Sequence, residues 1–350
     1  MCRKLSDRRA YPAVFPTFVR MVSVILPFRN AERTLAEAIQ SIVDQTFKEW
    51  ELVLIDNAST DASGKIAVQF ARIDTRIKLI HEDRIGIAHA LNTGLDHASG
   101  ELIARMDADD ISLPDRIEKQ NQYLRDHPQI GVLGTRTMFR STVEKSSGMH
   151  WFVEWQNRII SPEEHFVKRF IDAPLAHPSV MFRRELIDRH GSYSTDPLPE
   201  DHELWLRWMD AGALFAKLPE ELLIWNDGID RLSRSHPNYS VHSFYRTKVK
   251  WLAKWLKKIP GDRMLIIAGT SPICRDRAQL LEAEGVRVDA FTDVRHREVP
   301  CYRFIAHDHL PPKGEAFIVS FISQRGTGDR IANYFNSIGL EEGIDFILAA

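Results

Sequence analysis

The chain has 350 residues, and because single hydrophobic cores stop growing at roughly 250–300 residues, we expect two domains. Apolar residues make up 44% and charged residues 27% of the chain, as in an ordinary globular protein. The formal net charge of −2 excludes a general electrostatic attraction to nucleic acid. Three widely spaced cysteines, Cys2, Cys274 and Cys301, argue against a disulfide framework or a cysteine zinc site and fit a reducing, cytoplasmic environment.

The N-terminal segment, residues 1–20, is basic, contains two prolines and lacks a small-residue cleavage site. It is therefore not a convincing signal peptide, and we expect a poorly ordered N-terminal extension. No window of the sequence approaches the roughly 18–20 uninterrupted apolar residues of a membrane span, so no transmembrane segment is expected.

Strands and helices alternate along the first third of the chain. Strands are expected at Val22–Pro27, Trp50–Ile55, Ile77–His81 and Glu101–Met106, and helices at Ala31–Gln45, Ser63–Arg72 and Ile87–Ala98. This alternation predicts an α/β domain with a mixed, mainly parallel sheet flanked by helices. Ligands bind at the carboxyl ends of the strands in such sheets. Polar or acidic residues follow three of the four expected strands, which suggests a site at that edge.

The pattern weakens from about residue 135 to residue 172. It returns at Ala176–Arg183, in an expected helix at Glu200–Asp210, and in an expected strand at Leu222–Trp225. The following segment, Val241–Lys258, contains six Lys or Arg residues and no acidic residue. We favour an interdomain helix there, and peripheral contact with an anionic membrane surface is the alternative interpretation.

The C-terminal part contains a second series of strands and helices. Strands are expected at Met264–Ala268, Val286–Phe291, Phe317–Phe321 and Phe346–Leu348, and helices at Cys274–Glu284 and Asp329–Ile338. The predicted domains are thus an extension (1–20), a large α/β domain (21–240), a linker helix (241–262) and a small Rossmann-like α/β domain (263–350). The turn at Ala268–Cys274 lacks most of the glycines that a dinucleotide needs, so we expect a docking or regulatory role rather than NAD binding.

The sharpest feature of the sequence is Asp107-Ala108-Asp109-Asp110. Three carboxylates so close together repel one another unless a cation is shared. Residues i and i+2 of an extended segment point the same way, so Asp107 and Asp109 can face one divalent cation such as Mg²⁺ or Mn²⁺. The alternative is a solvated acidic loop in which Asp110 caps the helix after Pro114.

Five ordered segments resemble the family 2 glycosyltransferases of the GT-A fold. They read VSVILPFRN, QTFKEWELVLIDNASTD, ASGELIARMDADDISLPDR, HPSVMFRR and PEDHELWLR. The first three cover Val22–Arg116, and the last two extend the resemblance to about Tyr239. Small Rossmann-like appendages such as the expected C-terminal domain are found behind some of these transferases.

The resemblance implies a nucleotide-diphosphate sugar as donor, a divalent metal and inversion at the anomeric carbon. By match to the family motifs, Asp109 is the direct metal ligand and Asp107 binds the ribose or the metal shell. Donor-binding roles also fall on residues at the other strand ends, namely Pro27, Asn30, Asp56, Asn57 and Arg84. Many members carry a second aspartate where this chain has Asn57. An amide can donate as well as accept hydrogen bonds, so this departure leaves the base open.

The second pair of carboxylates is Glu200-Asp201. Inverting transfer needs a base that removes a proton from the attacking hydroxyl, and the family match places it at Asp201. A capping pair at a helix N-terminus is the alternative. Glu200, His177 and Trp225 are expected at the acceptor or along the cleft.

The expected function is therefore an inverting, metal-dependent glycosyltransferase that acts on a saccharide or lipid-linked saccharide acceptor. Cell-surface polysaccharide or lipopolysaccharide biosynthesis, in the cytoplasm or at the inner face of the membrane, is the usual setting of such relatives. A nucleotidyltransferase is a weak rival, because no glycine-rich phosphate loop follows the first strand. A non-catalytic nucleotide-sugar-binding or scaffold protein on a transferase fold is the alternative from another class.

Overall fold

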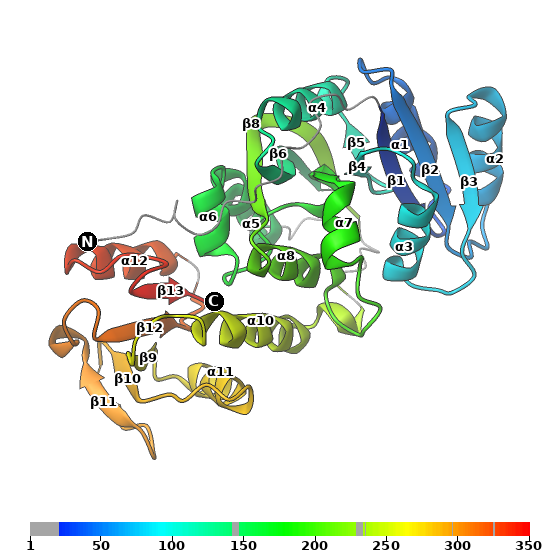
Figure 1. Ribbon diagram of the computed structural model, residues 1–350. Coiled ribbons are helices and arrows are strands. Elements are labelled where there is room, and N and C mark those ends of the chain that lie inside the picture. The colour runs from blue at the N-terminus through cyan, green and yellow to red at the C-terminus, as the bar shows by residue number, and fades with distance from the viewer. Residues whose placement is uncertain (1–20, 142–146, 229–233, 235, 296, 325) are drawn as a thin grey trace. The chain divides into compact units, whose positions relative to one another are not determined.

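The computed structural model describes residues 21–350 except 142–146, 229–233, 235, 296 and 325 (Figure 1). The expected N-terminal extension, residues 1–20, therefore lies outside the described residues. The chain divides into two compact units. The first contains residues up to 162, 175–196 and 207–235, and the second contains 163–174, 197–206 and 236–350. The predicted domain limits remain a prediction.

The first unit is built on an eight-stranded mixed sheet of order β3-β2-β1-β4-β7-β6-β8-β5. Its strands are β1 (Val22–Phe28), β2 (Trp50–Asp56), β3 (Ile77–His81), β4 (Leu102–Arg105), β5 (Ile111–Ser112), β6 (Ile130–Ser141), β7 (Met181–Arg183) and β8 (Leu214–Asp227). β1 to β4 are parallel to one another, and β7 runs antiparallel to both of its neighbours. The mixed α/β fold expected from the sequence is confirmed.

Helices cover both faces of this sheet. They are α1 (Leu35–Val43), α2 (Ser63–Ile73), α3 (Ile87–His97), α4 (Arg116–Asp126), α5 (Ser147–Arg158) and α7 (Arg184–His190), with the short helix η2 (His177–Ser179) before β7. Apolar side chains of α1 and α4 share one core with β1. On the other face α3 packs closely, since a Cβ on Gly94 would lie 2.6 Å from Ile25 Cγ2 and 2.8 Å from Ile55 Cδ1.

The register of the sheet places three strand ends at one level. Phe28 at the end of β1 pairs with Asp56 at the end of β2, and Asp56 pairs with His81 at the end of β3. β4 joins the other side of β1, with Arg105 opposite Ile25. The loops that leave β1, β2, β3 and β4 therefore start from one edge of the sheet, as the sequence pattern predicts.

The second unit contains a five-stranded parallel sheet of order β11-β10-β9-β12-β13. Its strands are β9 (Met264–Ala268), β10 (Ala290–Asp293), β11 (Arg303–Ala306), β12 (Ala316–Ser320) and β13 (Phe346–Leu348). Counted within the unit, this is the order three-two-one-four-five of a doubly wound Rossmann-like sheet.

Helices α10 (Val241–Leu256) and α11 (Pro272–Ala283) pack on one face of this sheet, and α12 (Gly328–Ser337) packs on the other. α6 (Pro162–Lys168), the start of α8 (Glu200–Asp210) and the short helices η3 (Pro237–Tyr239) and η4 (His307–His309) also belong to this unit. Within the part of the chain that the structure describes, no helix combines the length and the apolarity needed to span a bilayer.

Several strands differ from the sequence expectation, since β5, β6 and β11 are not among the expected strands and β8 and β10 begin at other residues than expected. β6 lies where the pattern is weak, and β8 begins eight residues before the expected Leu222. β10 begins at Ala290 rather than at Val286, because its pairing with β9 starts there. Val286 and Val288 are nevertheless buried. They are apolar because they pack in the core in the segment that precedes β10, and they form no strand pairs there.

Candidate active site

The ends of β1 and β2 are tied together by short hydrogen bonds. The side-chain oxygen of Asn30 accepts from the backbone N–H of Thr60 at 2.8 Å, and the backbone N–H of Asn30 donates to Ser59 Oγ at 3.1 Å. Asn30 (φ 50°) and Ala58 (φ 56°) both occupy the left-handed region, which is unusual for residues other than glycine. Pro27 lies inside β1 and is buried. These contacts hold two strand-end loops in fixed positions.

Asp56 is the last residue of β2 and its side chain is buried. One carboxylate oxygen accepts from the backbone N–H of Ser59 at 2.9 Å, and the other lies 3.7 Å from His81 Nδ1. Its Oδ2 is also only 3.1 Å from the position that a Cβ on Gly64 would take. Asp56 is thus a buried carboxylate that is fixed at the sheet edge by neighbouring loops.

Asn57 uses its amide to position the loop after β3. Its Nδ2 donates to the carbonyls of Glu82 at 3.0 Å and Arg84 at 2.8 Å, and its Oδ1 accepts from the N–H of Gly86 at 2.8 Å. A carboxylate could accept from Gly86 but could not donate to the two carbonyls. This is a physical reason for an amide at position 57.

Arg84 lies on that loop with a side chain that is 67% exposed. Its guanidinium pairs with Glu82 at 2.7 Å and 2.9 Å, and Thr93 Oγ1 donates to the same carboxylate at 2.5 Å. The Arg84 hydrogen bonds lower the pKa of Glu82 well below its ordinary value. Asn57 and Glu82 therefore hold an exposed arginine at the sheet edge.

Asp107 follows β4 directly and is paired with a buried arginine. The Nη1 of Arg105 contacts Asp107 Oδ1, and the arginine side chain is only 5% exposed. Burial alone would lower the pKa of Arg105, but the charge of Asp107 and the hydrogen bond to it raise the value. Arg105 thus neutralises one carboxylate of the acidic cluster from within the fold.

Asp110 is the buried member of the cluster, with 1% of its surface exposed. Its Oδ1 accepts from the backbone N–H of Asn226 at 2.8 Å, while Oδ2 has no hydrogen-bond partner within the described part of the chain. Burial raises its pKa well above the ordinary value, and the nearby charges of Asp107 and Asp109 raise it further. The alternative in which Asp110 caps the next helix is wrong, because α4 begins after Asp115.

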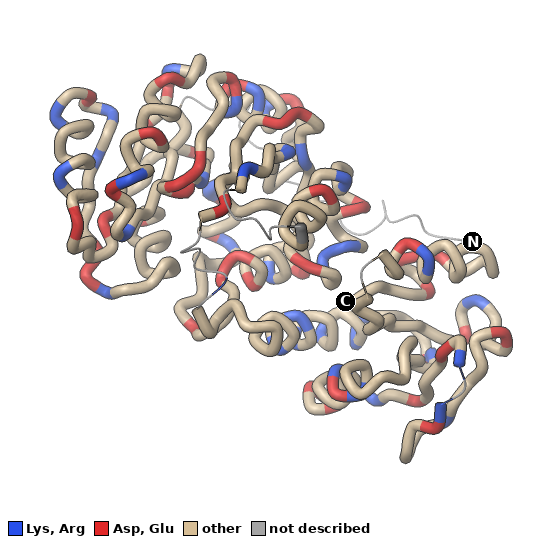
Figure 2. The backbone as a smooth tube through the Cα atoms, turned by 180° about the vertical axis from the view of Figure 1, so that it is seen from behind, with Lys and Arg blue, Asp and Glu red and all other residues tan. Residues whose placement is uncertain are grey.

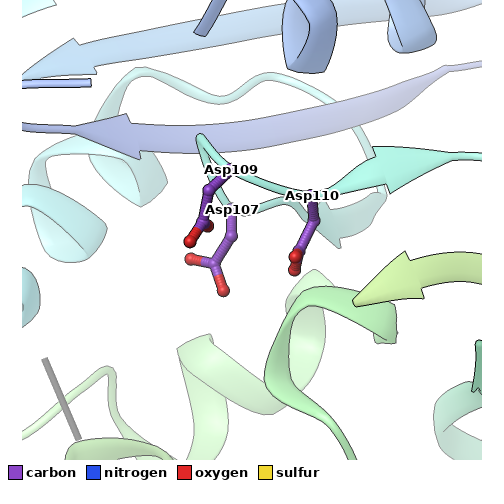
Figure 3. A group of neighbouring side chains, drawn as sticks. All are labelled: Asp107, Asp109 and Asp110. Atoms are coloured by element: carbon purple, nitrogen blue, oxygen red, sulfur yellow. The ribbon is translucent and has the colours of Figure 1, made fainter. Parts of the chain in front are cut away.

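The three carboxylates converge at one point. Asp107, Asp109 and Asp110 each offer an oxygen, and these oxygens lie within 4.8 Å of one another. Figure 3 shows the three side chains leaving the loop on the same side. Two oxygens on opposite sides of Mg²⁺ lie roughly 4.2 Å apart, twice a bond of about 2.1 Å. The hard oxygen donors and the unpaired buried oxygen of Asp110 therefore fit a divalent cation.

The acidic cluster lies near the corner formed by Asp56 and Asn57. β1 separates β4 from β2, so two strand spacings, roughly 10 Å, lie between their ends. Asp107 comes two residues after Arg105, which is opposite Ile25, and Asp56 is opposite Phe28. The structure thus brings together, within the first unit, the residues predicted to bind the metal and the nucleotide.

Two further buried residues, Arg116 and His177, lie within electrostatic reach of Arg105. Arg116 is fully buried and donates to the carbonyls of Pro178 at 2.6 Å and Arg105 at 3.1 Å. Burial lowers its pKa to about 10. His177 is buried with its Nε2 2.8 Å from the hydroxyl of Tyr193, and burial, reinforced by the charge of Arg105, lowers its pKa well below the ordinary value. His177 is therefore neutral at pH 7.

The other expected cleft residues have different environments. Trp225 in β8 is buried and packs with Val153 and Ala176. Glu200 and Asp201 begin α8 and lie in the second unit. Glu200 is buried and accepts from the hydroxyl of Tyr239 at 2.6 Å, while Asp201 Oδ1 accepts from the backbone N–H of His202 at 2.7 Å.

The sequence interpretation did not identify Arg105 or Glu82 as part of this edge. The available signal for Arg105 was a charged residue inside an apolar strand, immediately before the acidic motif. No comparable local signal marks Glu82, because its role depends on Asn57, Arg84 and Thr93, which other elements supply. Both residues orient other side chains, and neither is part of a recognisable sequence motif.

Comparison with known proteins shows which family this chain is similar to. The family model described as "Glycosyl transferase family 2" matches residues 23–191. EpsE of Bacillus subtilis (strain 168), which its name assigns to the glycosyltransferases, is 37% identical over 230 residues, or 63% of this chain and 78% of EpsE. The amylovoran biosynthesis glycosyltransferase AmsE of Erwinia amylovora is 29% identical over 244 residues, or 65% of this chain and 86% of AmsE.

Solved structures agree on the fold. The crystal structure of S. aureus TarS 1-349 in complex with UDP-GlcNAc superposes with a TM-score of 0.54 and 18% sequence identity, and the match covers 75% of this chain and 71% of the TarS 1-349 chain. The resemblance and the GT-A fold expected from the sequence are thereby confirmed. The chain belongs to glycosyl transferase family 2, and it is a glycosyltransferase.

Proposed function

We propose that this chain transfers a sugar from a nucleotide-diphosphate sugar to a hydroxyl of a saccharide or lipid-linked saccharide, with inversion at the anomeric carbon. The observation that carries the proposal is the convergence of Asp107, Asp109 and Asp110 at the edge of the sheet that also holds Asp56 and Asn57. The UDP-GlcNAc complex of TarS, which shares this fold, supports a nucleotide sugar as the donor class.

The acidic cluster would hold Mg²⁺ or Mn²⁺, with Asp109 as a direct ligand and Asp107 as a ligand of the ribose or of the metal shell. Such an ion offsets the negative charge that develops on a departing nucleotide diphosphate. Asp56 and the loop positioned by Asn57 would bind the nucleoside, and the exposed Arg84 would meet the phosphates. Asn30, which is bonded to the loop after β2, and Pro27, which is buried in β1, would complete the donor-binding side.

Asp201 would act as the base. In a single displacement the acceptor oxygen forms a bond to the anomeric carbon while the bond from that carbon to the diphosphate breaks. The acceptor proton passes to the Asp201 carboxylate, and the electron pair of the broken bond leaves with the nucleotide diphosphate. A positioned base of this kind contributes about 10²–10⁴-fold to the rate. Glu200, His177 and Trp225 are proposed to line the acceptor side.

The setting we propose is the biosynthesis of a cell-surface polysaccharide or lipopolysaccharide in the cytoplasm. The name of AmsE, from amylovoran biosynthesis, supports a polysaccharide product. A membrane-associated acceptor would also suit α10, which presents the exposed basic residues Arg246, Lys250 and Lys254 at a spacing of four. Lys and Arg recur along this helix in Figure 2.

Contact of α10 with the membrane has a direct test. Each basic residue near an anionic surface contributes about 1 kcal/mol. The protein should therefore sediment with phosphatidylglycerol vesicles and remain in solution with phosphatidylcholine vesicles. Lys250→Glu combined with Lys254→Glu should release it from the anionic vesicles. Equal sedimentation of wild type and variant would refute the contact.

The proposed activity is tested by measuring nucleoside diphosphate release from a panel of nucleotide sugars with Mn²⁺ and candidate acceptors. One donor should give release that EDTA abolishes. The anomeric configuration of the product, read by NMR, should be opposite to that of the donor. The rival non-catalytic scaffold predicts no release from any donor, and a retained configuration would exclude inversion.

A further inference from the structure

The loop after β4 contains one more carboxylate than the Asp-x-Asp pattern requires. Asp110 is buried to 99%, and its Oδ1 is already used by the backbone N–H of Asn226. Its Oδ2 has no hydrogen-bond partner among the residues that the structure describes. A buried oxygen of this kind is costly to leave unpaired, so a partner for it is to be expected.

The charges around the cluster show which partner would fit. Arg105 is paired with Asp107, and the two Nη atoms of Arg116 donate to backbone carbonyls. Neither arginine donates a hydrogen bond to Asp110 Oδ2. A divalent cation takes carboxylate oxygens of this kind as ligands.

The geometry also favours a shared cation. An oxygen of Asp110 lies within 4.8 Å of oxygens of both Asp107 and Asp109 (Figure 3). Asn226 fixes this arrangement from β8, because its backbone N–H binds Asp110 and its side-chain Nδ2 donates to the carbonyl of Asp109 at 2.6 Å. Adjacent residues of the loop are thereby held by one residue of a different strand.

We propose that Asp110 is a direct ligand of the divalent cation through Oδ2, beside the Asp109 ligand of the proposed function. The inference rests on the proposed function, since the cation is the one proposed for sugar transfer. The competing role is purely structural, with Asp110 serving as counter-ion to the buried guanidinium groups of Arg105 and Arg116.

The test compares two variants that each replace one carboxyl group by an amide. Asp110→Asn keeps an oxygen for the N–H of Asn226 but removes the charged ligand. Asp115→Asn is the matched control, because Asp115 is a partly exposed carboxylate of the same unit that pairs with Lys119. Binding of Mn²⁺ alone is followed by electron paramagnetic resonance of the free ion, and thermal unfolding is recorded in EDTA.

The proposal predicts that Asp110→Asn weakens Mn²⁺ binding by at least about tenfold, that Asp115→Asn binds as wild type, and that neither variant unfolds earlier in EDTA. Unchanged Mn²⁺ binding by Asp110→Asn would overturn the proposal. So would earlier unfolding of Asp110→Asn in EDTA, or its failure to fold, because a counter-ion role predicts both. If wild type bound no Mn²⁺, the metal dependence in the proposed function would be refuted as well. Unchanged Mn²⁺ binding or earlier unfolding of Asp110→Asn would refute only the ligand role of Asp110.

Discussion

The two units each present the carboxyl edge of parallel strands, and the two edges differ in what occupies them. In the first unit the edge carries converging carboxylates and an amide that positions a loop. In the second unit the first turn after β9 is closed. A Cβ on Gly269 would lie 2.6 Å from Cys274 Sγ and 2.8 Å from Ile322 Cγ1.

Polar groups at the second edge are bonded to one another. The N–H and hydroxyl of Thr270 both donate to Asp293 Oδ2, at 2.9 Å and 2.7 Å. Arg277 donates to the carbonyl of Phe321 at 2.7 Å. Parallel topology offers a binding position at both edges, but the side chains decide whether it is available. The expectation that the second unit does not bind NAD remains a prediction, and this geometry supports it.

The largest expected effect is on turnover, which should depend on the edge of the first unit and not on the edge of the second. Asp109→Ala removes a metal ligand and should lower turnover by about 10³-fold or more, since metal stabilisation of a leaving group is worth several kcal/mol. Thr270→Val, at the other edge, should leave turnover unchanged. Steady-state release of nucleoside diphosphate measures both. Comparable losses in the two variants would show that the edges do not differ in this way.

The next effect concerns the base. Asp201→Asn should reduce kcat by at least about 10²-fold while the affinity for the donor stays the same, because the variant loses proton removal but no donor contact. Donor affinity is measured by calorimetry and kcat with a competent acceptor. A rate near that of wild type would show that another group accepts the proton.

A smaller effect tests how the first edge is built. Asn57→Asp leaves two buried carbonyls, those of Glu82 and Arg84, without their donor. The free energy of unfolding of the first unit should fall by about 2–3 kcal/mol, and KM for the donor should rise. Asp83→Asn, an exposed change on the same loop, is the control. Equal urea midpoints for the two variants would remove the structural reason for Asn57.

The smallest effect belongs to the second unit and depends on pH. Burial, chiefly, lowers the pKa of Lys248 from 10.5 to about 7. Between these values the unfolded chain binds a proton that the folded chain does not, so stability rises with pH. From pH 7.5 to pH 8.5 the gain is about 1.4 kcal/mol.

Hydrogen exchange of β9 and β12 amides reports this gain when wild type is compared with Lys248→Met at each pH. The difference in protection between the two proteins should grow in favour of wild type as pH rises. A constant difference would mean that Lys248 keeps an ordinary pKa in the folded unit.

Much of the fold could be predicted because β1 to β4 are short apolar runs separated by helices. β6 was missed for a physical reason. Its Gly131 and Gly134 weaken the strand pattern but allow close packing, since a Cβ on Gly134 would lie 2.5 Å from Leu175 Cδ2. In β8, Pro219 and two glutamates hide the first half of a long strand, which also contains register shifts.

The clustering of Asp107 and Asp109 could be predicted because one local motif contains both residues. The site was not predictable where the role depends on tertiary contacts. The burial of Asp110 comes from β8 and Asn226, and the hydrogen bonds of Asn57 come from a loop about 25 residues further along the chain. Neither environment is visible in the local sequence.

The central claim is that the edge with Asp56, Asn57 and the acidic cluster binds a nucleotide diphosphate together with a divalent cation. Thermal unfolding with Mn²⁺ and UDP, GDP, CDP or dTDP tests it most directly, since a ligand at about 100 times its Kd adds about 2.7 kcal/mol of stability. We predict that one nucleotide with Mn²⁺ raises the Tm of wild type and of Cys274→Ala but not of Asp109→Ala. An equal rise in Asp109→Ala, or no rise with any nucleotide, would contradict the account.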